Sequence, residues 1–136
     1  MIYTLLKNWG YTGFKRHIEN VANVYRAKRD LFETAMKTHL TGLAEWNPPE
    51  AGMFVWFKLL LPPCEGSDEG DSEDLIQRAV AKHKVLALPG TSFYANGRKT
   101  AYVRASFSVL PEYQFGEVAR RLALVVREAQ AAALPT

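Results

Sequence analysis

The sequence predicts an α+β domain, in which a small, largely antiparallel sheet has helices packed on one side. Residues 14–40 and 115–129 carry apolar side chains at helical spacing. Residues 53–59 and 102–108 have the composition or the alternation of strands. The expected order is helix, strand, helix, strand, strand, helix, without an internal repeat. This order favours one small sheet covered by helices.

Length and composition narrow the class of protein. The 136 residues suffice for one domain with its own core, which we expect over residues 1–136, and a hydrophobic content of 48% indicates a globular chain. The sequence has no apolar run of about 18 residues, and its N-terminus lacks the pattern of a signal peptide. Cys64 is the single cysteine, which excludes an intrachain disulfide and fits a reducing compartment. We expect a cytoplasmic protein without membrane contact.

The net charge of +3 is mild, and the basic residues are spread along the predicted helices. Nucleic-acid binding normally needs a concentrated basic patch or stripe. We therefore expect no nucleic-acid partner.

The first predicted helix covers residues 14–40, with Thr12 as a candidate N-cap and Gly42 as the stop. Unbroken, it would be about 40 Å long at about 1.5 Å per residue, long enough to lie along something outside the domain. A turn at 46–52 follows, because two consecutive prolines exclude regular structure there. The strand at 53–59 is apolar on both faces. We expect a cover on each side, one of them from a surface of this chain or of another.

Residues 62–71 are acidic and glycine-rich, and they predict a flexible surface loop. Asp71 or Ser72 then caps a short helix that ends near Lys84. A short buried strand is expected at 85–88, and residues 91–94 could form a hairpin with the following strand, although the connection is long for a tight turn. Pro111 suits the first position of the last helix.

The strand at 102–108 alternates cleanly. Val103, Ala105, Phe107 and Val109 are expected on the packed face; Tyr102, Arg104, Ser106 and Ser108 are expected on the open face. Arg104 therefore presents a planar fork of donors among small hydroxyl groups, a geometry that matches a carboxylate. The alternative is a solvated arginine or a weak surface ion pair.

Other side chains predict no chemistry. The three histidines lack metal-ligand spacing, and Cys64 lies in an acidic loop that would raise the pKa of its thiol. We expect no metal site and no catalytic residue in this chain.

Three segments, in order, carry a resemblance to a known family: PEAGMFVW at 49–56, VLALPGTSFY at 85–94 and YVRASFS at 102–108. Together they resemble the C-terminal small domain of fold-type-I aminotransferases that use pyridoxal 5'-phosphate (PLP). The similarity is strongest to fungal aromatic amino acid and 2-aminoadipate aminotransferases and to kynurenine aminotransferase II, and it covers nearly the whole chain.

The resemblance implies roles for five residues. Arg104 would bind the α-carboxylate of the substrate, and the segments around Gly52, Met53, Phe54 and Phe93 would lie near the substrate side chain. For these four residues the alternative is plain core packing.

The resemblance also implies what this chain lacks. The lysine, the aspartate and the phosphate-binding residues that hold PLP would belong to a large domain before residue 1, so we expect no cofactor-binding residue here and no activity of the chain alone. The parent enzyme would be a homodimer that moves an amino group between an aromatic or 2-aminoadipate-type amino acid and a 2-oxo acid. A stand-alone protein-interaction or single-stranded RNA-binding module is the alternative.

Overall fold

The computed structural model describes residues 1–85 and 87–133, and it confirms the predicted α+β class. The helices are α1 (Ile2–Leu40), α2 (Ser72–His83) and α3 (Phe115–Ala132), and two single 3-10 turns lie at Gly90–Phe93 and Glu112–Gln114. The strands are β1 (Ala44–Trp46), β2 (Phe54–Leu59), β3 (Leu88–Pro89) and β4 (Tyr102–Ser106). They form one antiparallel sheet in the order β1-β2-β4-β3.

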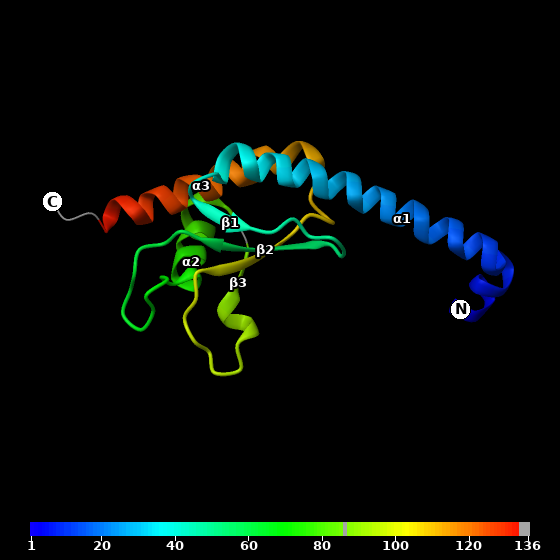
Figure 1. Ribbon diagram of the computed structural model, residues 1–136, viewed down its shortest axis with the longest axis horizontal. Coiled ribbons are helices and arrows are strands. Elements are labelled where there is room, and N and C mark those ends of the chain that lie inside the picture. Colours follow the sequence, from blue (N-terminus) through cyan, green and yellow to red (C-terminus); the bar gives the residue numbers. More distant parts are fainter. Residues whose placement is uncertain (86, 134–136) are drawn as a thin grey trace.

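One face of the sheet is buried against the helices. Val55, Phe57 and Leu59 of β2 and Val103 of β4 point into a single core that also receives side chains from α1, α2 and α3. Figure 1 shows α1 and α3 running side by side along the sheet. Because successive side chains of a strand alternate, the opposite face of β2 carries Phe54 and Trp56, which are exposed. That face is where the predicted site residues lie.

The first helix is longer than predicted and its path is interrupted. It begins at Ile2, and Gly10, with a φ of 62° that glycine adopts easily, divides it into two helical segments. Thr12 lies in the first turn of the second segment rather than at its cap. Gly42, with a φ of 78°, confirms the predicted stop. The sheet covers only the last third of α1, where Phe32 and Met36 are buried.

The N-terminal half of α1 projects away from the sheet (Figure 1). Its apolar residues, which the helical spacing predicted to face a core, are therefore exposed: Phe14, Ile18 and Val21. Further exposed apolar residues precede them, among them Trp9.

The shortest elements differ from the prediction. The sequence did not predict β1, because its three residues end directly before the Asn47-Pro48-Pro49 turn. Of the strand predicted at 85–88, Leu88 lies in β3, and Leu86 is outside the described residues. Residues 91–93 form a 3-10 turn rather than a hairpin strand, although β3 does pair with β4.

Of the predicted helix starts, that of α2 is confirmed and that of α3 differs from the prediction. Asp71 caps α2 as predicted, because its Oδ1 accepts hydrogen bonds from the backbone N–H groups of Glu73 and Asp74. Pro111 instead precedes a 3-10 turn, and α3 begins at Phe115. Val109, predicted on the packed face, is exposed because β4 ends at Ser106.

Candidate functional site

Arg104 lies at the centre of the open sheet face. It stands on β4 between two neighbours, with Trp56 of β2 opposite it on one side and Leu88 of β3 on the other. The register places Phe54 opposite Ser106 and Lys58 opposite Tyr102. The alternation predicted from the sequence therefore puts the guanidinium on the face that the helices leave open.

Two phenyl rings hold the guanidinium. The Arg104 Cζ lies 4.3 Å from the ring centroid of Phe54 and 4.6 Å from that of Phe93. A cation over an aromatic face is attracted by the ring quadrupole, and such contacts contribute about 0.5–1 kcal/mol each at exposed sites. The rings orient the guanidinium without using its N–H donors.

The Arg104 donors have no internal acceptor among residues 1–85 and 87–133. No carboxylate of this part of the chain lies within 4.0 Å of the guanidinium, and no side-chain hydrogen bond of Arg104 is formed. A weak surface ion pair, the alternative considered above, is therefore not what holds Arg104. The fork remains available to an external anion.

Phe54 and Phe93 are not core residues. They are 42% and 45% exposed, which excludes the alternative of plain core packing for both. Phe93 reaches Arg104 from the 3-10 turn Gly90–Phe93, and Phe54 reaches it from the start of β2. The Pro89-Gly90 sequence makes this approach possible, because a Cβ at position 90 would lie 2.7 Å from the carbonyl oxygen of Tyr102.

Two further aromatic residues extend the face. The Trp56 ring packs edge-on against Phe93, with centroids 5.2 Å apart, and it stacks on Tyr102 at 5.7 Å. Sequence reasoning did not name Trp56 or Tyr102 as site residues. For Tyr102 the signal was present, because alternation placed it on the same face as Arg104; the position of Trp56 depends on the register between β2 and β4.

Gly52 and Met53 lie at the rim of this face. Gly52 adopts a φ of 83°, which ends the turn that precedes β2. The carbonyl oxygen of Met53 accepts hydrogen bonds from the Phe107 N–H at 3.2 Å and from the Ser106 Oγ at 3.3 Å. The start of β2 is thereby joined to the end of β4. The structure brings Phe54 and Phe93 to Arg104, whereas Gly52 and Met53 line a separate hollow between the 47–52 turn and α1.

Two hollows open on this face. A small cavity of about 230 Å³ is lined by Phe54, Leu88, Arg104 and Ser106, among others. A larger groove of about 910 Å³ lies beside it and includes Phe54, Trp56, Lys58 and Tyr102. Phe54 separates the two. The guanidinium thus borders a space large enough for a carboxylate, next to a groove whose lining combines aromatic and charged side chains.

The residues of the face do not fit a PLP site. PLP chemistry requires an amine that forms a Schiff base and an acid that pairs with the pyridinium nitrogen. Lys58 is the lysine that β2 places here, and its hydrogen bond with Glu69 at 2.7 Å raises its pKa and keeps it charged. A charged, paired ammonium is not a nucleophile. We derive no step of cofactor chemistry from these residues.

The described residues contain no group of three His, Cys, Asp or Glu side chains that could hold a metal ion. Across the same ranges, none of the helices combines the length and the apolarity needed to cross a bilayer. Phe107 is completely buried, so it cannot stack on a base as an RNA-binding sheet would require.

The fold and this face together define a class. The chain resembles the C-terminal small domain of fold-type-I, PLP-dependent aminotransferases, and known aminotransferases match it in both sequence and structure. No family model matches the chain.

Among particular relatives, the chain is 45% identical to the aminotransferase tdiD of Emericella nidulans over 123 residues, which are 90% of this chain and 27% of that protein. It is 36% identical to the mitochondrial kynurenine/alpha-aminoadipate aminotransferase of Mus musculus, over 94% of this chain and 29% of that protein.

The crystal structure of LysN, the alpha-aminoadipate aminotransferase of Thermus thermophilus, superposes with a TM-score of 0.79 at 29% identity. The superposition covers 97% of this chain and 31% of the LysN chain. The LysN structure was determined with N-(5'-phosphopyridoxyl)-L-leucine. The chain therefore spans about 30% of the length of the relatives it matches.

Proposed function

We propose that this chain is the C-terminal small domain of a PLP-dependent aminotransferase, and that Arg104 binds the α-carboxylate of its amino-acid and 2-oxo-acid substrates. The substrate class that we propose is an aromatic or 2-aminoadipate-type amino acid, in line with the names of several relatives. The parent enzyme would be a cytoplasmic homodimer whose large domain supplies the PLP site.

The observation that carries the proposal is the state of Arg104. Its guanidinium stands on an open sheet face, is oriented by two rings, and has no carboxylate partner among the described residues. Arginine binds a carboxylate through two parallel hydrogen bonds, and orientation in advance lowers the entropy lost on binding. Gly52, Met53, Phe54 and Phe93 would border the substrate side chain, since all four adjoin this guanidinium or its rim.

Exposed apolar surface supports the proposal that a large domain is missing from the described chain. Both the open sheet face and the first half of α1 carry large apolar side chains, including Trp56 and Trp9. Large exposed apolar patches mark surfaces that contact another protein or domain. The large domain would cover it.

The test is kinetic. In the proposed full-length enzyme, Arg104→Ala removes a charged, bidentate contact that contributes on the order of a few kcal/mol, so kcat/KM for the amino acid should fall about 100-fold or more. Arg104→Lys keeps the charge but not the fork, and it should recover a small part of the loss.

Arg78→Ala is the control. Arg78 is an exposed arginine of α2, paired with Asp74, and it lines neither hollow of the open sheet face. Its removal should leave kcat/KM near that of the wild type. An Arg104→Ala enzyme with unchanged kcat/KM would show that another group binds the carboxylate.

A further inference from the structure

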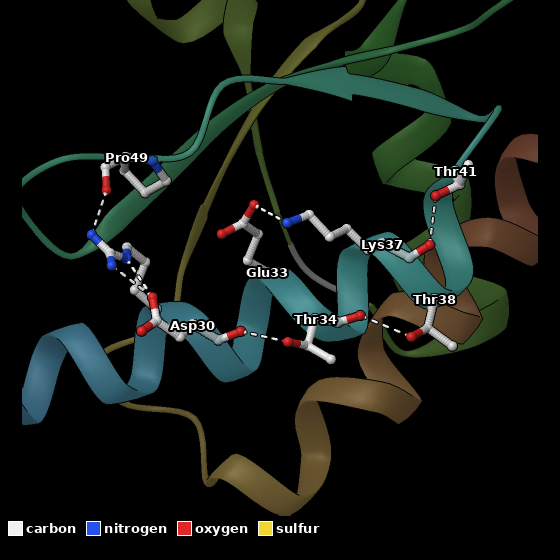
Figure 2. Close-up of polar contacts among 8 residues, drawn as sticks. Asp30, Glu33, Thr34, Lys37, Thr38, Thr41 and Pro49 are labelled. Carbon is white, nitrogen blue, oxygen red and sulfur yellow. Dashed lines mark hydrogen bonds and ion pairs between the residues drawn. The ribbon is translucent and has the colours of Figure 1, made fainter.

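Two adjacent cationic residues of α1 reach the rim of the Arg104 face. Lys28 donates a hydrogen bond from its Nζ to the carbonyl oxygen of Ser108, at 2.8 Å. Arg29 donates from its Nη1 to the carbonyl oxygen of Pro49, at 3.2 Å (Figure 2). The two carbonyls belong to the two backbone segments that meet at the open end of β2 and β4.

The segment 47–52 depends on this contact. Pro48 and Pro49 have no N–H to donate, so regular backbone pairing is excluded there. Outside the strand ladder, the bond from Arg29 is the one hydrogen bond that residues 47–52 receive within the described chain. Arg29 is itself held, because its Nε and Nη2 donate to the Asp30 carboxylate at 2.8 and 2.7 Å.

The segment after β4 is tied to the same helix. Ser108 receives the Lys28 bond on its carbonyl oxygen, and its Oγ hydrogen-bonds with the Ser106 Oγ at 2.8 Å. The Ser106 Oγ in turn donates to the Met53 carbonyl oxygen. These hydrogen bonds connect Lys28 to the end of β4, and the end of β4 to the start of β2. The start of β2 directly follows the turn that Arg29 contacts at Pro49.

We infer that Lys28 and Arg29 are positioning residues for the substrate site. They fix the turn 47–53 and the end of β4 against α1, and this sets the start of β2. Phe54 follows the turn directly and packs on the Arg104 guanidinium, so the angle of the carboxylate-binding fork depends on where the turn is held. This inference rests on the proposed function of Arg104.

The side chains are suited to this role rather than to binding substrate directly. The Arg29 side chain is 25% exposed, and the hydrogen bond of Lys28 is partly buried. Both donors are engaged by backbone carbonyls. A charged donor bound to a neutral carbonyl holds backbone more firmly than a neutral pair would.

The test uses Lys28→Met and Arg29→Met in the proposed full-length enzyme, since methionine keeps an unbranched apolar stem and removes the donor. We expect KM for the amino acid to rise about tenfold, the effect of losing one charge-assisted hydrogen bond, with kcat within about twofold of the wild type. Lys28→Arg and Arg29→Lys should restore KM. Arg16→Met, an exposed change on the same helix, is the control and should alter neither constant.

A second readout does not depend on activity. Hydrogen–deuterium exchange of the 136-residue chain should accelerate at Phe107 and Ser108, whose N–H groups donate to the Met53 carbonyl oxygen and to the Ser106 Oγ, for both methionine variants and stay unchanged in α2. If KM and exchange both stay at wild-type values while Arg104→Ala is impaired, the positioning role is wrong and the proposed function stands. If Arg104→Ala itself is unimpaired, the proposed function fails, and the exchange result alone decides whether the two residues hold the rim.

Discussion

That the Arg104 guanidinium contacts two rings and no internal carboxylate can be tested by measuring how far its substitution lowers the free energy of unfolding of the chain. In Arg104→Met, the loss is two cation–π contacts, at 4.3 and 4.6 Å, which amounts to about 1–2 kcal/mol. Methionine then packs its own stem and sulfur on the same two rings, which recovers about 0.3–1.5 kcal/mol. The net cost should therefore stay below about 2 kcal/mol.

The assay is urea unfolding of the 136-residue chain, followed by tryptophan fluorescence. Phe57→Ala provides the upper reference, because Phe57 is 1% exposed in the core and should cost about 3–5 kcal/mol. A cost of about 3–5 kcal/mol for Arg104→Met would refute the reasoning. It would mean that the guanidinium neutralises an internal charge, since breaking a buried pair costs that much.

Three further predictions concern the chain itself. Asp71→Ala should destabilise it by about 1 kcal/mol through loss of the α2 cap, measured by urea unfolding. Glu117 has its pKa lowered to about 2 by hydrogen bonds from Arg120 and Arg121, so its stabilising contribution is complete above about pH 4.5 and is lost as the pH falls toward 2. The stability difference between wild type and Glu117→Gln should shrink over that range, and a constant difference would contradict the pKa. PLP added to the chain should give no saturable absorbance change that responds to amino acids, and turnover would show a cofactor site that the described residues do not reveal.

The main elements of the fold could be predicted because their signals are local. Alternation at 102–107 identified β4 and its open face, and the Gly42 stop and the Asp71 cap follow from the conformations and hydrogen bonds those residues favour. Elements of two or three residues carry too little pattern. The strand β1 was hidden by the prolines that follow it, and residues 91–94, most of which lie in the 3-10 turn, include Thr91, Phe93 and Tyr94, residue types that favour strands.

Periodicity also failed to say how much of α1 the domain would cover. An amphipathic pattern predicts that a face is buried, but it does not identify the partner. The sheet ends near Phe32, so the same pattern that is buried at Met36 is exposed at Ile18.

The candidate site was predictable in part. Strand alternation placed Arg104 on the open face, and the resemblance assigned the neighbouring segments. Local patterns could not show that Phe93 contacts Arg104 from another element. Nor could they show that the Arg104 guanidinium has no carboxylate partner among the described residues. Those facts depend on contacts between distant residues. The contacts of Lys28 and Arg29 depend on tertiary packing in the same way, since 80 and 20 residues separate the partners.

The most direct measurement is a crystal structure of the proposed full-length enzyme with an amino-acid substrate analogue bound. We expect the Arg104 guanidinium to donate two parallel hydrogen bonds to the α-carboxylate, at about 2.7–2.9 Å, with the rings of Phe54 and Phe93 still on either side of it. An analogue whose carboxylate is bound by a different residue, while Arg104 contacts only the two rings, would contradict the account.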